Sequence, residues 1–254
     1  IKGASRGAVE TLDEEMRLAS RLQRDFLPRR MPEIGAGRFS VLYRPVSFVS
    51  GDIYDVTRLD ETHVGFYVAD AVGHGLPAAL LTMFIKKALQ TKRIVGNTYE
   101  IIPPDDSLAE LNDDICGQDL SSCNFCTAVY GVLDVANLTL TYARAGHPAP
   151  VLIRRDGTVE HLEASGCLLG VFEEAVFEAR QVSLQPGDRV VLYTDGACDS
   201  MGTETSEEFT DIFGPDLTLP RPDMMAAVSA RVEEACSTSR QTDDITIMTL
   251  DIEA

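Results

Sequence analysis

Four aspartates, far apart in the chain, constrain what this sequence can fold into more than any other feature. Asp52, Asp70, Asp195 and Asp243 each lie where an apolar, strand-like run meets a turn. Carboxylates at strand ends project from a rigid scaffold, and Mg²⁺ and Mn²⁺ prefer oxygen ligands while they retain several waters. The pattern therefore predicts a centre for hard divalent cations that is assembled from distant segments and needs no imidazole or thiolate.

The segments around these aspartates form an ordered set of five motifs. They read Gly51-Asp52-Ile53-Tyr54-Asp55, Asp70-Ala71-Val72-Gly73-His74-Gly75, Ala145-Gly146-His147-Pro148, Tyr193-Thr194-Asp195-Gly196 and Asp243-Asp244-Ile245-Thr246. Each motif alone is weak evidence, but the order is specific. Together they resemble the signature of the PPM/PP2C-type metal-dependent protein serine/threonine phosphatases, in the bacterial branch of the stage II sporulation phosphatase E and RsbU-like regulators.

The resemblance implies a role for each motif residue and a cofactor of two Mn²⁺ or Mg²⁺ ions. In that family the equivalent of Asp70 bridges the two ions, Asp52 holds one of them, and Asp195 and Asp243 hold the other. The backbone carbonyl of Ala71 would add a ligand. A metal-bound hydroxide would then attack phosphorus in line, without a phosphoenzyme, because two metals both activate water and neutralise charge.

Other motif residues are expected to surround these ligands, namely Asp55, Gly73, His74, Gly75, His147, Gly196 and Asp244. Gly73 and Gly75 would permit a tight turn. His74 and His147 lie in glycine-flanked turns, where a histidine more often bonds the backbone, so neither is assigned to catalysis. The alternative for each aspartate is an ordinary turn former or helix cap.

Composition excludes several classes of protein. The chain has 254 residues, 44% of them hydrophobic, which suffices for a sizeable core. A formal net charge of −18 argues against nucleic acid and against anionic membrane surfaces. With no signal peptide pattern and no run of about 18 apolar residues, the sequence predicts a cytoplasmic protein that does not enter the membrane.

Six scattered cysteines predict reduced, mostly buried thiols. Cys123-x-x-Cys126 leaves structural zinc as a lesser alternative, since no second pair lies nearby. The first residue is Ile rather than Met, so we expect an upstream sensory or receiver domain.

The chain divides into an N-terminal helical linker, residues 1–30, and one catalytic domain, residues 31–254. Apolar residues spaced by three and four predict an amphipathic helix over 8–27 that ends at Pro28. Two interpretations of this helix stand side by side. It could pair with a second copy as a coiled-coil-like homodimer, or it could pack on its own domain.

The remaining pattern predicts an α+β fold. Short β-branched runs separated by tight turns predict antiparallel strands at 39–46, 52–59, 63–70, 126–134, 138–145, 150–154, 158–162, 176–184, 188–194 and 245–252. Helices are expected after Gly75, from a capping box at Ser107-x-x-Glu110, and over 223–236. The resemblance sharpens this pattern to two antiparallel sheets sandwiched between helical layers.

The expected function is hydrolysis of phosphoserine or phosphothreonine on a regulatory protein of the anti-anti-sigma type. The polar segment from Cys198 to Pro222 resembles a variable flap that contacts substrates. A catalytically silent module that sequesters a regulatory partner is the alternative, and retention of all four aspartates argues against it. A looser alternative is a metal-dependent hydrolase of small phosphoesters.

Overall fold

The computed structural model describes residues 2–73, 75–118, 125–203, 205–238 and 241–253, with the backbone alone for residues 2–9 and 238. Two five-stranded sheets, in which every neighbouring pair of strands is antiparallel, form its centre. The first sheet has the order β1 (Gly37–Arg44), β12 (Ile245–Ile252), β11 (Arg189–Tyr193), β8 (Val151–Ile153) and β9 (Val159–His161). The second has the order β10 (Arg180–Ser183), β7 (Thr139–Ala145), β6 (Cys126–Asp134), β3 (His63–Ala71) and β2 (Asp52–Arg58).

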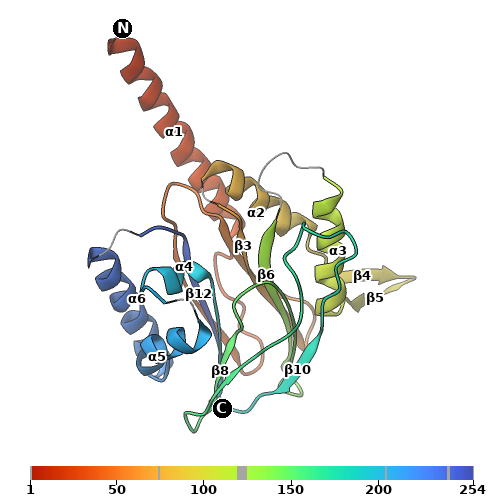
Figure 1. The fold of residues 1–254 in the computed structure, drawn as a ribbon. Helices are drawn as coiled ribbons and strands as arrows, with labels where there is room; N and C mark the ends of the chain where they lie inside the picture. Colours follow the sequence, from red (N-terminus) through yellow and green to blue (C-terminus); the bar gives the residue numbers. More distant parts are fainter. Residues whose placement is uncertain (1, 74, 119–124, 204, 239–240, 254) are drawn as a thin grey trace.

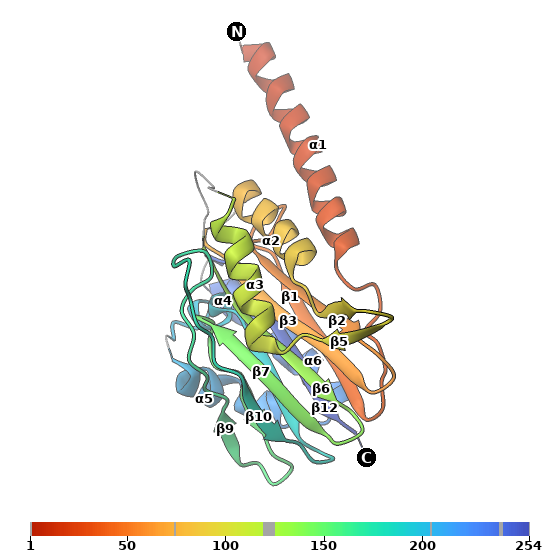
Figure 2. The same ribbon diagram turned by 90° about the vertical axis from the view of Figure 1, so that its right-hand side faces the viewer.

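Helices cover the outer faces of both sheets (Figures 1 and 2). The second sheet is covered by α2 (Leu76–Ala88) and α3 (Pro104–Cys116). The first is covered by α4 (Asp195–Asp199), α5 (Ser206–Leu217) and α6 (Arg221–Thr238). The predicted α+β sandwich of two antiparallel sheets between helical layers is therefore confirmed.

Central strands show why this sequence adopts four layers. All eight residues of β12 are buried, and β6 is buried along most of its length. A strand in such a position faces the other sheet on one side and a helix on the other, so it reads as a continuous apolar run rather than an alternating one. On the outer face of the first sheet, the rings of Tyr193 and Phe209 stack with centroids 3.7 Å apart.

The N-terminal helix α1 (Lys2–Phe26) projects away from the layered body (Figures 1 and 2). Among its residues with described side chains, 10–26, the buried ones are Ser20 and Gln23, near the C-terminal end, and the following Leu27 is buried too. The predicted helix is present and begins earlier than expected. A domain boundary near residue 30 stays a prediction. Among the described helices, none is long and apolar enough to cross a bilayer.

Two local expectations were wrong. Ser107 does not cap a helix, because α3 begins at Pro104, where a missing N–H costs nothing and the fixed φ suits the first turn. The strand expected at 176–184 is only β10, since the segment before Arg180 is irregular. Residues 198–222, for which the role of a flap stays a prediction, contain the helix α5, which was not expected although its capping box at Thr205 and Glu208 was visible in the sequence.

The chain also forms a ribbon that was not expected. β4 (Lys92–Val95) and β5 (Thr98–Ile101) pair between α2 and α3 and stand out from the body (Figure 1). Cys116, Cys126, Cys167, Cys198 and Cys236 are free thiols. Cys123 lies outside the described residues, so the zinc alternative remains untested.

One buried ion pair lies at the end of the first sheet that is opposite Asp195, and its arginine also bonds the chain at the end of α5. The guanidinium of Arg189 donates from Nε to Asp251 Oδ1 at 2.7 Å and from Nη1 to the carbonyl of Leu219 at 3.0 Å. Asp251→Ala would leave a buried guanidinium without its counter-charge, so we expect a loss of about 3 kcal/mol in the free energy of unfolding. Urea unfolding measures it. The control is Glu253→Ala, which removes half-exposed ion pairs and should cost less than about 1 kcal/mol; equal losses would contradict the assignment.

Candidate metal centre

Each sheet brings two of the four aspartates to the same end of the sandwich. In the second sheet Asp52 opens β2 and lies opposite Asp70, near the end of β3. In the first sheet Asp195 follows β11, and Asp243 lies just before β12. Because these two strands are antiparallel, with Tyr193 opposite Ile247, their two aspartates lie at the same end. The fold thus brings together four aspartates that lie far apart in the sequence.

Asp52 is the buried anchor of this set. Its side chain is 1% exposed, and its Oδ2 accepts hydrogen bonds from Thr194 Oγ1 at 2.8 Å and Thr246 Oγ1 at 2.6 Å. Burial raises the pKa of Asp52 to about 8, although the two threonine hydroxyls oppose the shift. Both threonines belong to the first sheet, so these bonds join the two sheets beneath the centre.

Asp70 experiences the other carboxylates most strongly. Burial raises its pKa to about 10, and the negative charges of Asp52, Asp195 and Asp243 add to the shift. Burial also raises the pKa of Asp195, as does the charge of Asp199. For Asp243, burial again comes first and the charge of Asp195 contributes. These mutual effects place the four carboxylates within electrostatic reach of one another.

The donor chemistry fits a hard divalent cation. Carboxylates from both sheets lie at one end of the sandwich and raise one another's pKa, and a cation would stabilise their ionised forms. The carbonyl oxygens of Ala71 and Gly73 also approach this place, since a Cβ on Gly51 would meet them at 3.1 and 2.9 Å. In the described part of the chain, no three acidic, histidine or cysteine side chains converge as they stand on a point that would hold an ion.

Asp244 has a different role from its neighbour Asp243. It is 2% exposed, and its carboxylate accepts from the backbone N–H of Val46 and of Gly51, both at 2.6 Å. These bonds fix the loop that leads into Asp52. A charge-assisted bond from two backbone donors is strong, so Asp244 positions the loop rather than offering itself to a ligand.

Steric constraints explain why glycine occupies several positions in the motifs. Gly73 and Gly75 both have φ of +82°, in the left-handed region where glycine is favoured. A Cβ on Gly196 would lie 2.0 Å from the carbonyl oxygen of Asp244, so only glycine fits between the two metal-motif segments. His74, between the first two glycines, lies outside the described residues.

The structure does not bring Asp55 and His147 into the centre. Asp55 forms an ion pair with Lys86 of α2. His147 is buried, and its Nδ1 lies 2.7 Å from Thr127 Oγ1, on the residue opposite Asp70. Burial, with Arg144 nearby, lowers the pKa of His147 to about 3, so the imidazole is neutral and supports the sheet end.

Gln23 is a residue that the motif analysis missed. Its Nε2 donates to the carbonyl of Ser50 at 2.7 Å and to Thr82 Oγ1 at 3.1 Å, and its Oε1 accepts from the N–H of Ser50 at 2.9 Å. The amide therefore connects α1 to α2 and to the residue two positions before Asp52. A polar residue beside the apolar seam of the helix was the available signal.

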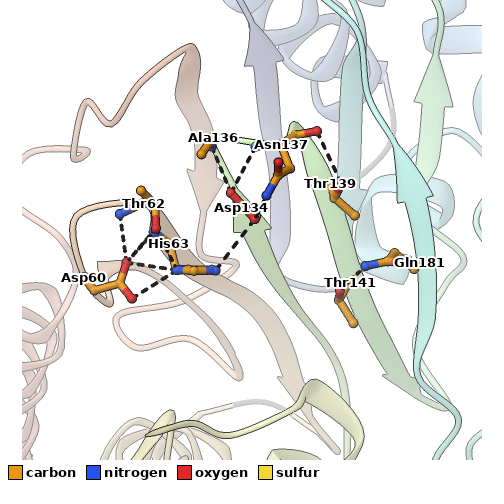
Figure 3. A network of polar contacts seen from close by, with 9 residues as sticks. All are labelled: Asp60, Thr62, His63, Asp134, Ala136, Asn137, Thr139, Thr141 and Gln181. Carbon is orange, nitrogen blue, oxygen red and sulfur yellow. Dashed lines mark hydrogen bonds and ion pairs between the residues drawn. The ribbon is translucent and has the colours of Figure 1, made fainter. Parts of the chain in front are cut away.

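A separate cavity of about 480 Å³ lies at the opposite end of the second sheet. Figure 3 shows its polar network, in which His63 Nδ1 lies 2.9 Å from Asp60 Oδ1 and Nε2 lies 4.0 Å from Asp134 Oδ2. Asp134 also accepts from the N–H groups of Ala136 and Asn137. These carboxylates close turns, so the cavity is distinct from the aspartate centre and we assign it no chemistry.

Comparison with known proteins agrees with the geometry. The family described as Stage II sporulation protein E (SpoIIE) matches residues 60–253. The chain belongs to the SpoIIE family. It thus has the fold of the PP2C-type phosphatases, a class that depends on metal ions.

Named relatives support this assignment. Phosphoserine phosphatase RsbP of Bacillus subtilis is 30% identical over 189 residues, which are 73% of this chain and 45% of RsbP. Phosphoserine phosphatase RsbU of the same organism is 28% identical over 237 residues, 93% of this chain and 64% of RsbU. The chain therefore spans about half to two thirds of these relatives.

A solved structure reproduces the whole fold. The SiaA-PP2C domain of Pseudomonas aeruginosa superposes with a TM-score of 0.82 at 27% identity, covering 97% of this chain and 99% of that domain. The agreement extends over both sheets and their helical layers.

The crowded carboxylates make the metal-free protein sensitive to pH. The folded state raises the pKa of Asp52 and Asp70, so it holds protons that the unfolded chain releases near pH 4. Stability is then present below that pH and is lost as the pH rises toward the folded values of about 8 and 10. In chelator at pH 8, we expect Asp70→Asn to raise the free energy of unfolding by roughly 1–2 kcal/mol.

Urea unfolding from pH 5 to 9 measures this effect, and the decline with pH should be shallower in Asp70→Asn. Asp244→Asn is the matched control, because an amide cannot accept from both Val46 and Gly51 and should destabilise the fold at every pH. A lower stability of Asp70→Asn in chelator would contradict the electrostatic description.

Proposed function

We propose that this domain hydrolyses phosphoserine or phosphothreonine on a regulatory protein. The carrying observation is that the two sheets bring four aspartates to one end of the sandwich. There burial, with the charges of Asp52, Asp195 and Asp243, raises the pKa of Asp70 to about 10. We assign two Mn²⁺ or Mg²⁺ ions to this centre, with ligands from Asp52, Asp70, the carbonyl of Ala71, Asp195 and Asp243. Such cations supply an activated water near neutral pH and neutralise charge on the phosphoryl group.

The chain's own residues would orient this centre. Thr194 and Thr246 engage Oδ2 of Asp52, and among the described residues no hydrogen bond engages Oδ1, which stays available to a ligand. Asp244 fixes the loop before Asp52, and Gly196 lets the segment of Asp195 approach it. His147 is neutral and buried, so it holds structure and transfers no proton.

The names of the relatives guide the choice of substrate. RsbP and RsbU are both named phosphoserine phosphatases. The ordered motifs resemble those of enzymes that act on anti-anti-sigma-type factors, so we propose a phosphorylated factor of that type as the substrate. A cytoplasmic location and an upstream sensory or receiver domain remain predictions.

Phosphate release from a phosphoserine peptide across a Mn²⁺ titration tests the proposed activity. We expect metal-dependent turnover, and we expect Asp195→Asn to lower it at least 100-fold because a ligand of the centre is lost. Asp211→Asn is the control, since it removes the same charge from the exposed surface of α5 and should change turnover less than twofold.

Calorimetry separates the remaining outcomes. Mn²⁺ binding that weakens sharply in Asp70→Asn, without turnover in the parent protein, would favour the silent binding module. Equal Mn²⁺ binding by the parent and Asp70→Asn would refute the ligand assignment. Turnover of p-nitrophenyl phosphate but of no phosphoprotein would favour the hydrolase of small phosphoesters.

The exposed flank of α1 supports a homodimer. Leu18 and Leu22 are 54% and 55% exposed, and Leu12 and Phe26 lie on the same side of the helix. Apolar residues repeated along a projecting helix are typical of a coiled-coil seam. We propose that two copies pair along this flank.

Light scattering tests the dimer. The parent chain should have twice its monomer mass, and Leu18→Glu with Leu22→Glu should return the monomer because charges would enter the seam. Arg29→Glu, just beyond the helix, should leave the dimer intact. A monomeric parent chain at micromolar concentration would refute the proposal.

A further inference from the structure

A basic groove lies in the angle between α1 and the domain. Arg17, Arg21 and Arg24 line it from the helix, and residues 46–48 line it from the loop that precedes Asp52. We call this concavity of about 600 Å³ the arginine groove. The three arginines recur at spacings of four and three, so they lie on one face of the helix.

The charges of the arginine groove are unusual for this molecule. Acidic residues outnumber Lys and Arg by 40 to 22, yet no described carboxylate pairs with any of the three guanidinium groups. Arg24 donates only to Ser20 Oγ at 3.1 Å, within its own helix. By contrast Arg154, Arg189 and Arg231 each form an ion pair with an aspartate.

Like charges one turn apart also weaken a helix. Arg17 and Arg21 are separated by four residues and Arg21 and Arg24 by three, spacings at which equal charges repel. Asp13, Glu14 and Asp25 lie at the same spacings from Arg17 and Arg21 and offset part of this repulsion. A partner with negative charge would remove the rest. The arginine groove is thus complementary to an anionic surface.

The arginine groove lies next to the aspartate centre. The N–H of Val46, in its wall, donates to Asp244, and Asp244 in turn holds the N–H of Gly51. From the helix side, Gln23 lies between the groove arginines in sequence and bonds both backbone groups of Ser50. Both walls of the arginine groove are therefore connected to the loop that leads into Asp52.

We propose that the arginine groove docks an acidic stretch of the phosphoprotein substrate while its phosphoserine lies at the aspartate centre. This inference rests on the proposed function. Guanidinium groups bind carboxylates through paired hydrogen bonds. Residues 17–24 span roughly 10 Å of helix, which an extended peptide of about three to four residues matches.

Electrostatics explains why this chain would need a docking site for an acidic substrate. A chain with a net charge of −18 and a carboxylate centre repels an acidic phosphoprotein at long range. A local positive groove beside the centre offsets that repulsion, steers the encounter and selects substrates with acidic residues near the phosphoserine. Small phosphoesters, which carry no carboxylates beside the phosphoryl group, would gain little from it.

Two fluorescein-labelled phosphoserine peptides of equal length test the docking. One carries four consecutive glutamates and the other four glutamines, and fluorescence anisotropy in chelator measures binding without turnover. We expect the parent chain to prefer the glutamate peptide at least tenfold at 50 mM salt, and the preference to shrink at 300 mM salt. Arg17→Ala with Arg21→Ala should reduce the preference to twofold or less.

Arg29→Ala with Arg30→Ala is the matched control. It removes the same charge close by but outside the arginine groove, so the preference should persist. With Mn²⁺, the groove variant should raise KM for the glutamate peptide at unchanged kcat, and turnover of p-nitrophenyl phosphate should not change. Thermal unfolding of both variants checks that these exposed substitutions leave the fold intact.

The outcomes separate this proposal from the proposed function. Equal binding of both peptides by the parent chain, or a preference that survives in the groove variant, overturns the docking site. Slower turnover of p-nitrophenyl phosphate in the groove variant also overturns it, because the arginines would then act on the centre itself. A groove-dependent preference without turnover of any substrate supports the docking site and refutes the phosphatase.

Discussion

The structure depends on two carboxylates that bind the sheets to each other at one end. Asp52 of the second sheet accepts from Thr194 and Thr246 of the first, and Asp244 of the first accepts from Val46 and Gly51. Both acids are buried, so losing these bonds would leave charge and backbone donors unsatisfied. The reciprocal arrangement fixes how the sheets meet, and with it where Asp70, Asp195 and Asp243 lie.

The choice of neutral donors has a further consequence. Threonine hydroxyls and backbone N–H groups hold Asp52 and Asp244 without adding positive charge, so the local negative potential persists. An arginine in their place would satisfy the same oxygens and would also compete with a cation. Asp55, by contrast, pairs with Lys86, which fits its position away from the centre. The uncompensated negative charge that favours cation binding thus also destabilises the metal-free fold.

The sequence revealed the strand-end aspartates because each follows or precedes an apolar run, and antiparallel pairing then brought their ends together. It marked Gln23 only as a polar residue beside the apolar seam and could not reveal its partners, since its bonds to Ser50 and Thr82 join positions 27 and 59 residues away. The residues alone did not separate Asp243 from Asp244, and only the family resemblance did, because their roles are set by which backbone groups the fold brings near. At Ser107 a valid capping pattern gave way to Pro104, because proline fixes the start of a helix more strongly than a side-chain cap does.

Different faces of α1 pack on the domain, expose apolar side chains and carry the groove arginines. Met16, Ser20, Gln23 and Leu27 follow the domain, Leu18 and Leu22 face solvent on one flank, and the arginines line the groove on the other. Any shift of the helix that breaks the bonds of Gln23 would release Ser50 and disturb Asp52 two residues later. The exposed leucines and the arginine groove therefore share a connection to the centre through Gln23, so occupancy of one surface can change the effect of the other on the aspartates through this helix.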